Sequence, residues 1–283
     1  MSHSEVVPLE RFHEEKYGRI LCYPRFDLKE LRRRLKELEE LEVKALKFTG
    51  ERTVFNVPVL GKGYVGIVVA ASMDGRKGAL KIRRVDADRT GMRREAEMLR
   101  KANAVNVGPN LIDASKNFLL MEFIEGTMLP RWAEELKERI KSRIRNVLRD
   151  VLEQCWRLDK VGLDHGELSR APRHIIVDAK DKPCVVDFET ASTSRRVSNV
   201  TSVCNHLFMR SQTAKIIATA LGEIGKEELI RALRKYKQKH TREEFEEVLG
   251  VCDLDKGLDG WRISGQKHLH RKTATAIHTT KEI

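Results

Sequence analysis

The spacing of apolar residues divides the chain into a helical start, a strand-rich middle and a helical remainder. Four leucines between residues 28 and 38 recur at the three- and four-residue intervals of an amphipathic helix. Asp27 precedes them as a helix cap, and Glu30 is placed to reach back to the amide of Asp27. We predict a helix of about 20 residues whose leucines pack on the body of the protein, because the stripe is too short for a coiled coil.

Short runs of β-branched residues begin at residue 57. Glycine-containing turns separate them, which predicts a meander of antiparallel strands. A charged segment at 90–101 predicts a helix, and two more strands are expected after it. The expected strands are 57–60, 65–71, 79–82, 110–114 and 118–123.

The pattern becomes helical after residue 126. Apolar residues follow helical spacing over 132–159 and within 199–251, and short strands are expected only at 174–177 and 184–186. Strands followed by helices predict an α+β fold with two lobes. The expected division is an N-terminal helical extension at 1–50, an N-lobe at 51–125, a C-lobe at 126–250 and a basic, disordered tail at 251–283.

Composition narrows the class of protein. The chain has 283 residues, of which 41% are hydrophobic, and this is too large a share for wholesale disorder. No apolar run approaches the roughly 18–20 residues of a membrane span and no secretory signal is visible, so we expect a cytoplasmic protein. The five scattered cysteines fit neither a disulfide framework nor a zinc site. A net charge of +12 indicates an anionic partner without choosing among nucleic acid, ribosomes, phosphates and lipid headgroups.

A glycine motif lies between the first expected strands. Gly61, Gly63, Gly66 and Val68 form the pattern G-x-G-x-x-G-x-V. In a dinucleotide-binding fold this motif opens a helix, whereas here the β-branched residues from Val65 onward continue as a strand. The motif therefore predicts a hairpin that closes over phosphates, because glycines let backbone amides approach closely. An ordinary glycine-containing hairpin is the alternative.

A lysine and a glutamate strengthen the phosphate interpretation. Lys81 lies inside an apolar strand, where a lysine has to be charge-paired or to extend its head toward water. Glu95 follows 14 residues later and shares a helix face with Leu99. A Lys–Glu pair of this kind holds a lysine against two phosphates. Taken alone, a glutamate such as Glu95 is more often a solvated helix charge.

Two acidic residues follow buried segments in the second half of the chain. Glu167 lies in a turn before the strand at 174–177, and Asp187 directly follows the strand at 184–186. Hard oxygen donors suit Mg²⁺, so Asp187 is a candidate metal ligand. The alternative for an aspartate in this position is a turn or a helix cap.

The series of glycine loop, strand lysine, helix glutamate, His-x-acid loop and Asp-Phe-x resembles the protein-kinase signature set. More narrowly, the segment His165-Gly166-Glu167-Leu168-Ser169 resembles the HGDLS loop of RIO-type atypical kinases, and the resemblance extends over about 57–205. It implies a bilobal kinase fold that binds ATP with Mg²⁺, or Mn²⁺, and transfers the γ-phosphate to a hydroxyl of a serine or threonine in a protein.

The resemblance also implies roles for single residues. Glu167 would accept or orient the proton of the acceptor hydroxyl, Lys81 would contact the α- and β-phosphates, and Asp187 would bind the metal ion. Glu122 and Ile124 would offer backbone groups to adenine, with Met121 at the back of the pocket. The full set implied for the nucleotide is Gly61, Gly63, Gly66, Val68, Lys81, Glu95, Met121, Glu122 and Ile124.

Three positions depart from the family pattern. Glu167 replaces an aspartate, and its extra methylene displaces the carboxylate on a scale that can cost about 10²-fold in rate. His174 stands where the family has a metal-binding asparagine, and imidazole suits softer metals than Mg²⁺. Glu189 replaces the glycine of Asp-Phe-Gly, and our hypothesis is that it supplies a second carboxylate to the metal.

The acceptor and the partners stay open. A small-molecule or lipopolysaccharide-type kinase and an ATP-binding pseudokinase scaffold are alternatives to a protein kinase. The excess positive charge predicts a second anionic partner, namely an acidic or phosphorylated protein, or RNA or a ribosome. Arginines near the two acidic motifs are candidates for this recognition, unless they only form a solvated basic face; they are Arg170, Arg173, Arg195 and Arg196.

Overall fold

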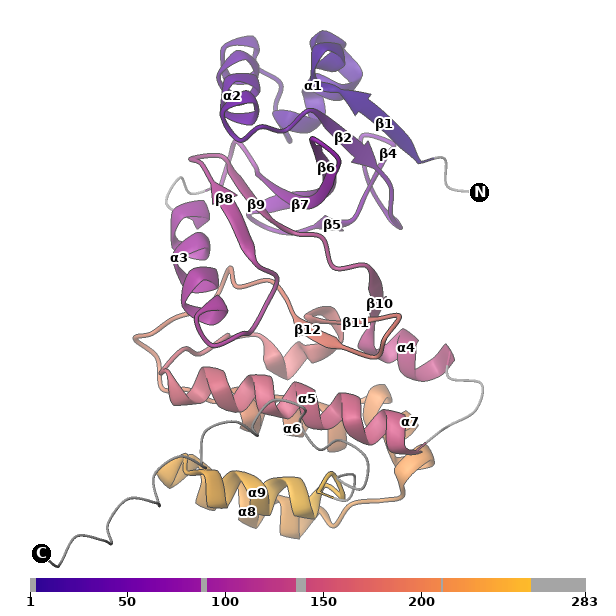
Figure 1. Cartoon of the computed structure of the whole chain (residues 1–283), viewed down its shortest axis with the longest axis vertical. Helices are drawn as coiled ribbons and strands as arrows, with labels where there is room; N and C mark the ends of the chain where they lie inside the picture. The colour runs from indigo at the N-terminus through magenta and orange to yellow at the C-terminus, as the bar shows by residue number, and fades with distance from the viewer. Residues whose placement is uncertain (1–3, 88–90, 136–140, 210, 256–283) are drawn as a thin grey trace, which may run out of the picture.

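One antiparallel sheet organises the first half of the chain (Figure 1). The computed structural model describes residues 4–87, 91–135, 141–209 and 211–255. The sheet has the order β1-β2-β6-β7-β9-β8, with β5 added beside β6, while β3 and β4 pair separately. The strands are β1 (Glu5–Pro8), β2 (Ala45–Phe48), β3 (Arg52–Val54), β4 (Val57–Val59), β5 (Gly61–Lys62), β6 (Gly66–Met73), β7 (Arg76–Arg83), β8 (Leu111–Ala114) and β9 (Phe118–Glu122).

The hairpin of β6 and β7 forms the centre of this sheet. Asp74 and Gly75 connect the two strands with φ values of 34° and 83°. Positive φ at both central residues is typical of the two-residue turns whose twist matches the strands that they join. The resulting register pairs Val68 with Lys81, so the turn fixes where the lysine lies.

The first 50 residues combine helices with strands. Their helices are η1 (Leu9–His13), α1 (Glu15–Leu21) and α2 (Leu28–Glu40), and β1 and β2 join the edge of the large sheet. Asp27 caps α2, since its side chain accepts a hydrogen bond of 2.7 Å from the amide of Glu30. The Glu30 carboxylate binds Arg33 and Arg34 instead of reaching back to Asp27, and α2 is shorter than the sequence predicts.

Helices dominate the second half of the chain. The expected helix at 132–159 is divided into α4 (Leu129–Glu135) and α5 (Lys141–Lys160). A small sheet of β10 (Gly126–Met128), β11 (Ile175–Asp178) and β12 (Pro183–Val185) lies between the large sheet and the helices (Figure 1). The remaining helices are α3 (Gly91–Asn103) beside the large sheet, η2 (Leu168–Arg173), α6 (Asn199–Phe208), α7 (Gln212–Leu221), α8 (Lys226–Lys239) and α9 (Arg242–Val251).

Two hydrophobic cores correspond to the two lobes, and β9 contributes to both. Phe118 and Leu120 belong to the core under the N-terminal helices, whereas Leu119 belongs to the core of the helical lobe. This alternation follows from the two-residue period of a strand. The predicted α+β, bilobal kinase-like fold is confirmed. No helix in the described ranges is long and apolar enough to cross a membrane, and the expected tail lies outside them from residue 256 onward.

Candidate active site between the lobes

Lys81 is buried in β7 and surrounded by carboxylates. Its Nζ atom lies 2.9 Å from Glu95 Oε1, 3.0 Å from Asp187 Oδ1 and 2.9 Å from Glu189 Oε2. Only 5% of Lys81 is exposed. Burial acts to lower the pKa of the lysine, but the attraction of the three carboxylates outweighs it and raises the pKa. Lys81 is therefore a fixed cation at neutral pH.

Glu95 reaches Lys81 because α3 turns one face inward. Met92, Ala96 and Leu99 on this face are buried, while Glu97 on another face is exposed. Glu95 shares the inner face and is 2% exposed. The pair that the sequence predicts from helical spacing is therefore present, and it ties α3 to the central strand of the sheet.

The glycine motif forms a hairpin and opens no helix. Gly61 pairs with Val68, and the amide of Gly63 donates to the carbonyl of Gly66 over 2.8 Å. A Cβ on Gly66 would lie 2.6 Å from the carbonyl oxygen of Ile82, so close packing of β6 on β7 requires this glycine. A Cβ on Gly61 or Gly63 would make only ordinary contacts. Packing within the described chain therefore does not require glycine at these two positions.

The connection between the lobes starts at the end of β9. Met121 and Glu122 are its last residues, and β10 begins at Gly126. The Glu122 carboxylate accepts hydrogen bonds from the amide and the side chain of Asn110, at 3.1 and 2.7 Å. Ile124 lies in the connection, outside both strands. The backbone at 123–125 is thus anchored at its start and lies in no strand of either sheet.

Hydrogen bonds with buried polar groups fix the loop at 164–167. The amide of His165 donates to Asn199 Oδ1 over 2.8 Å, and the His165 ring lies 3.1 Å from the carbonyl of Val186. Burial lowers the pKa of His165 to about 4, so its ring is neutral at physiological pH. Because the backbone at His165 is fixed in this way, Glu167 is held near the end of β12.

Glu167, His174 and Asp187 converge on one point. His174 Nε2 lies 3.2 Å from Glu167 Oε2, and His174 Nδ1 lies 3.7 Å from Asp187 Oδ2. One possible ligand atom from each residue lies within 4.8 Å of the others. Asp187 adopts the left-handed conformation, with φ of 70°, which directs its carboxylate toward the other two residues and Lys81.

The protonation of this cluster suits a bound cation. Burial lowers the pKa of His174, and the two carboxylates only partly offset the effect. Burial acts to raise the pKa of Asp187, but Lys81 leaves it lowered, so the carboxylate is ionised at neutral pH. His174 Nδ1 is buried without a hydrogen-bond partner, and a ring that donates through Nε2 to Glu167 turns the lone pair of Nδ1 toward Asp187. The lone pair of His174 Nδ1 and the Asp187 carboxylate repel each other unless a cation lies between them. The residues therefore fit a divalent cation with mixed nitrogen and oxygen ligands.

The same central segment has a recognisable sequence. Residues 69–199 match the sequence model of the RIO domain. This central segment of the chain is RIO-like. This family is atypical protein kinase-like and supports an ATP-binding phosphotransferase. No curated protein matches the chain.

The matched RIO segment contains most of the site. It starts within β6, after the glycine hairpin, and ends at Asn199, which holds the loop of His165. Glu189, which we expected at the metal, contacts Lys81 and lies outside the Glu167–His174–Asp187 group. The hairpin glycines at 61, 63 and 66 lie outside the segment that matches the family model.

Arg195 is a site residue whose role the sequence does not reveal. Its Nε donates to Asp164 Oδ2 over 3.0 Å, and its Nη2 donates to the carbonyl of Thr190 over 2.5 Å. Arg196 donates to the carbonyl of Lys237. Both arginines, which are candidates for binding a partner, thus also form hydrogen bonds within the chain. No spacing rule relates Arg195 to Asp164, because their contact depends on the path of the chain after Asp187.

Gly166 provides a test of how closely Arg195 packs on the loop at 164–167. Its φ is +90°, and a Cβ would lie 2.4 Å from Arg195 Nη2 and 2.9 Å from Thr190 Oγ1. We expect Gly166→Ala to lower the free energy of unfolding by about 2–3 kcal/mol. Gly162→Ala is the matched control, since Gly162 also has a positive φ of +70° but open space around its Cβ position. Equal losses for the two variants in urea unfolding would contradict this explanation.

Proposed function

We propose that the chain is an ATP-dependent protein kinase that transfers the γ-phosphate to a serine or threonine hydroxyl. The observation that carries the proposal is the position of Lys81, which lies between Glu95 and Asp187 and beside the Glu167–His174–Asp187 cluster. Phosphoryl transfer depends mainly on positioning and on neutralising charge, and this set of residues provides both.

The nucleotide would lie under the hairpin, between the lobes. Gly61, Gly63 and Gly66 would bring backbone amides to the phosphates, and Val68 faces the same space, opposite Lys81 in the ladder. Lys81 would exchange its contacts with Asp187 and Glu189 for phosphate oxygens while keeping Glu95. This exchange keeps the buried lysine paired with an anion in both states.

The adenine ring would bind at the connection between the lobes. Glu122 and Ile124 would offer backbone groups there, with Met121 lining the inner wall. The anchoring of Glu122 by Asn110 supports this assignment, because a fixed backbone loses less entropy when it binds a ligand.

The metal ion would bind to Asp187 and His174, with Glu189 as a further carboxylate once Lys81 turns to the phosphates. A divalent ion there would neutralise the charge that develops on the phosphate oxygens. Glu167 lies 3.2 Å from His174 Nε2 and would receive the proton of the acceptor hydroxyl. Because the imidazole nitrogen is a softer donor than an amide oxygen, we propose that Mn²⁺ supports the reaction better than Mg²⁺.

The function is tested by following the γ-phosphate of labelled ATP. The protein is incubated with Mg²⁺ or Mn²⁺, and the label is measured on protein, on small molecules and as free phosphate. Label on serine or threonine supports the proposal. Label on a small acceptor, or only as free phosphate, would replace it with a small-molecule kinase or an ATPase. Bound but intact ATP would indicate a pseudokinase scaffold.

His174→Asn is expected to reverse the metal preference. The amide oxygen of asparagine is a hard donor that suits Mg²⁺ better than imidazole does. We expect the ratio of the Mn²⁺-supported rate to the Mg²⁺-supported rate to fall by about tenfold. His240→Asn is the control, because His240 caps α8 in a left-handed conformation that asparagine tolerates. An unchanged ratio in His174→Asn would exclude His174 from the metal site.

A further inference from the structure

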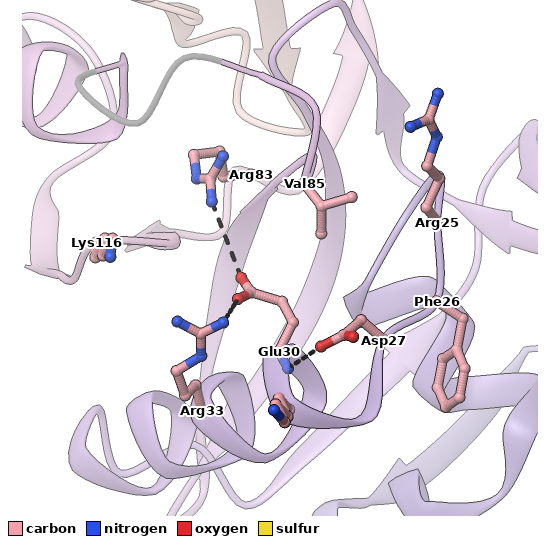
Figure 2. Close-up of a pocket in the computed structure, with 9 residues that line it drawn as sticks. Arg25, Phe26, Asp27, Glu30, Arg33, Arg83, Val85 and Lys116 are labelled. Carbon is pink, nitrogen blue, oxygen red and sulfur yellow. Dashed lines mark hydrogen bonds and ion pairs between the residues drawn. The ribbon is translucent and has the colours of Figure 1, made fainter.

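A pocket in the N-lobe is lined mainly by positively charged side chains. It lies where the turn before α2 meets the end of β7 and the β8–β9 turn, and its volume is about 400 Å³. It shares no residue with the site of Lys81 (Figure 2). The lining residues are Arg25, Phe26, Asp27, Lys29, Glu30, Arg33, Arg83, Val85 and Lys116. Five of these are cations and two are acids, which gives the lining a formal charge of 5 − 2 = +3.

The two acids of this pocket are already engaged. The side chain of Asp27 accepts the amide of Glu30 as a helix cap. Glu30 lies 2.8 Å from both Arg33 and Arg34, and Arg34 is fully buried. One carboxylate therefore faces two close guanidinium groups and can neutralise only one of them. Figure 2 shows Arg33, Arg83 and Lys116 gathered on one side of Glu30.

Two lysines of the lining add to this surplus. Lys29 and Lys116 are both exposed, and neither forms an ion pair with the residues that the structure describes. Lys29 and Arg33 are four residues apart on α2 and so share one face, where like charges repel in the absence of an anion. Lys116 approaches from a different segment. Arg83 is buried and donates to Asn117 and to two backbone carbonyls, so Lys29, Arg33 and Lys116 are the cations through which this argument runs. A concave site with such cations on two sides fits a phosphate group.

We propose that this pocket binds the phosphate group of a small phosphorylated molecule. Its volume is at the lower end of the range of about 300–1,000 Å³ for small-molecule sites, which favours a compact ligand over a nucleic-acid chain. The proposal is independent of the kinase activity, because none of the lining residues takes part in the site of Lys81.

The test uses inorganic phosphate as the probe. The thermal midpoint of the full chain is titrated with phosphate against chloride at constant ionic strength, without metal or nucleotide. We expect a saturable rise for the wild type and at least about tenfold weaker phosphate binding for the double variant Lys29→Glu/Lys116→Glu. Lys180→Glu/Lys215→Glu is the matched control, since both lysines are exposed in the helical lobe and the change in net charge is the same.

The outcomes separate the alternatives. Phosphate binding that is unchanged in Lys29→Glu/Lys116→Glu, or reduced equally in the control, would overturn the pocket assignment. A titration of single-stranded RNA runs in parallel. If phosphate leaves the wild-type midpoint unchanged while the pocket variant alone loses RNA binding, the surface recognises nucleic acid and the small-ligand proposal is wrong. Loss of phosphate binding in the pocket variant alone supports the proposal even if no kinase activity is found.

Discussion

Lys81→Met is expected to reduce phosphate transfer by about 10²–10³-fold and to lower the free energy of unfolding by about 3–5 kcal/mol. The cause is the same for both effects. Lys81 is the cation that faces Glu95, Asp187 and Glu189, and Glu95 is almost fully buried. Without the lysine, a buried carboxylate loses its counter-charge, and the phosphates of ATP lose a fixed positive partner.

The stability loss in Lys81→Met should depend on pH in a defined direction. Burial raises the pKa of Glu95, and removal of Lys81 takes away the attraction that opposes this rise. The folded variant then retains a proton that the unfolded chain releases at lower pH. Its stability is therefore highest below the unfolded pKa of about 4.3 and falls as the pH rises through the folded pKa. Urea unfolding at pH 5 and pH 8 should show the larger loss at pH 8.

Two variants separate the effects of Lys81→Met. Lys47→Met changes an exposed lysine on β2 of the same sheet and should leave both stability and transfer near the wild type. Lys81→Met/Glu95→Met replaces the buried pair with apolar side chains and should recover stability but not transfer. Full activity of Lys81→Met, with its folding intact, would remove the lysine from the proposed mechanism.

The sequence predicts well what depends on local spacing. The position of Glu95 follows from helical period, and the hairpin of Gly61–Gly66 follows from β-branched residues after the motif. Both signals lie within a few residues of the feature that they predict. The kinase-like order of the motifs also predicts that distant segments meet. Lys81 and Asp187 are separated by 106 residues, and their shared role in phosphate transfer requires them to lie close together.

Features that depend on contacts between distant segments are not visible in the sequence. β1 and β2 are short, and each joins a sheet whose other members lie elsewhere in the chain, so their pairing has no local signal. The turn after β12 brings the carboxylate of Glu189 to Lys81, a contact for which the sequence has no local signal. The contact of Arg195 with Asp164 likewise arises from how the segment after Asp187 returns to the loop.

Asp187→Asn is expected to abolish metal-dependent phosphate transfer, with a loss of about 10³-fold or more, while leaving the fold intact. Asparagine tolerates the left-handed conformation that Asp187 adopts at φ of 70°, so the backbone is preserved and only the charge is removed. Lys81 keeps Glu95 and Glu189 as partners. We therefore expect the free energy of unfolding to change by no more than about 1 kcal/mol.

The measurement for Asp187→Asn combines label transfer from ATP with a titration of Mn²⁺ binding. Asp74→Asn is the matched control, because Asp74 also has a positive φ but lies in the turn between β6 and β7, away from the site. Because Lys81 keeps the pKa of Asp187 low, the wild-type carboxylate stays ionised as the pH falls from 8 to 6. Burial likewise holds the pKa of His174 below its usual value, so we expect the Mn²⁺ affinity of the wild type to change little over that range. Full activity and unchanged Mn²⁺ affinity of Asp187→Asn would place the metal ion elsewhere.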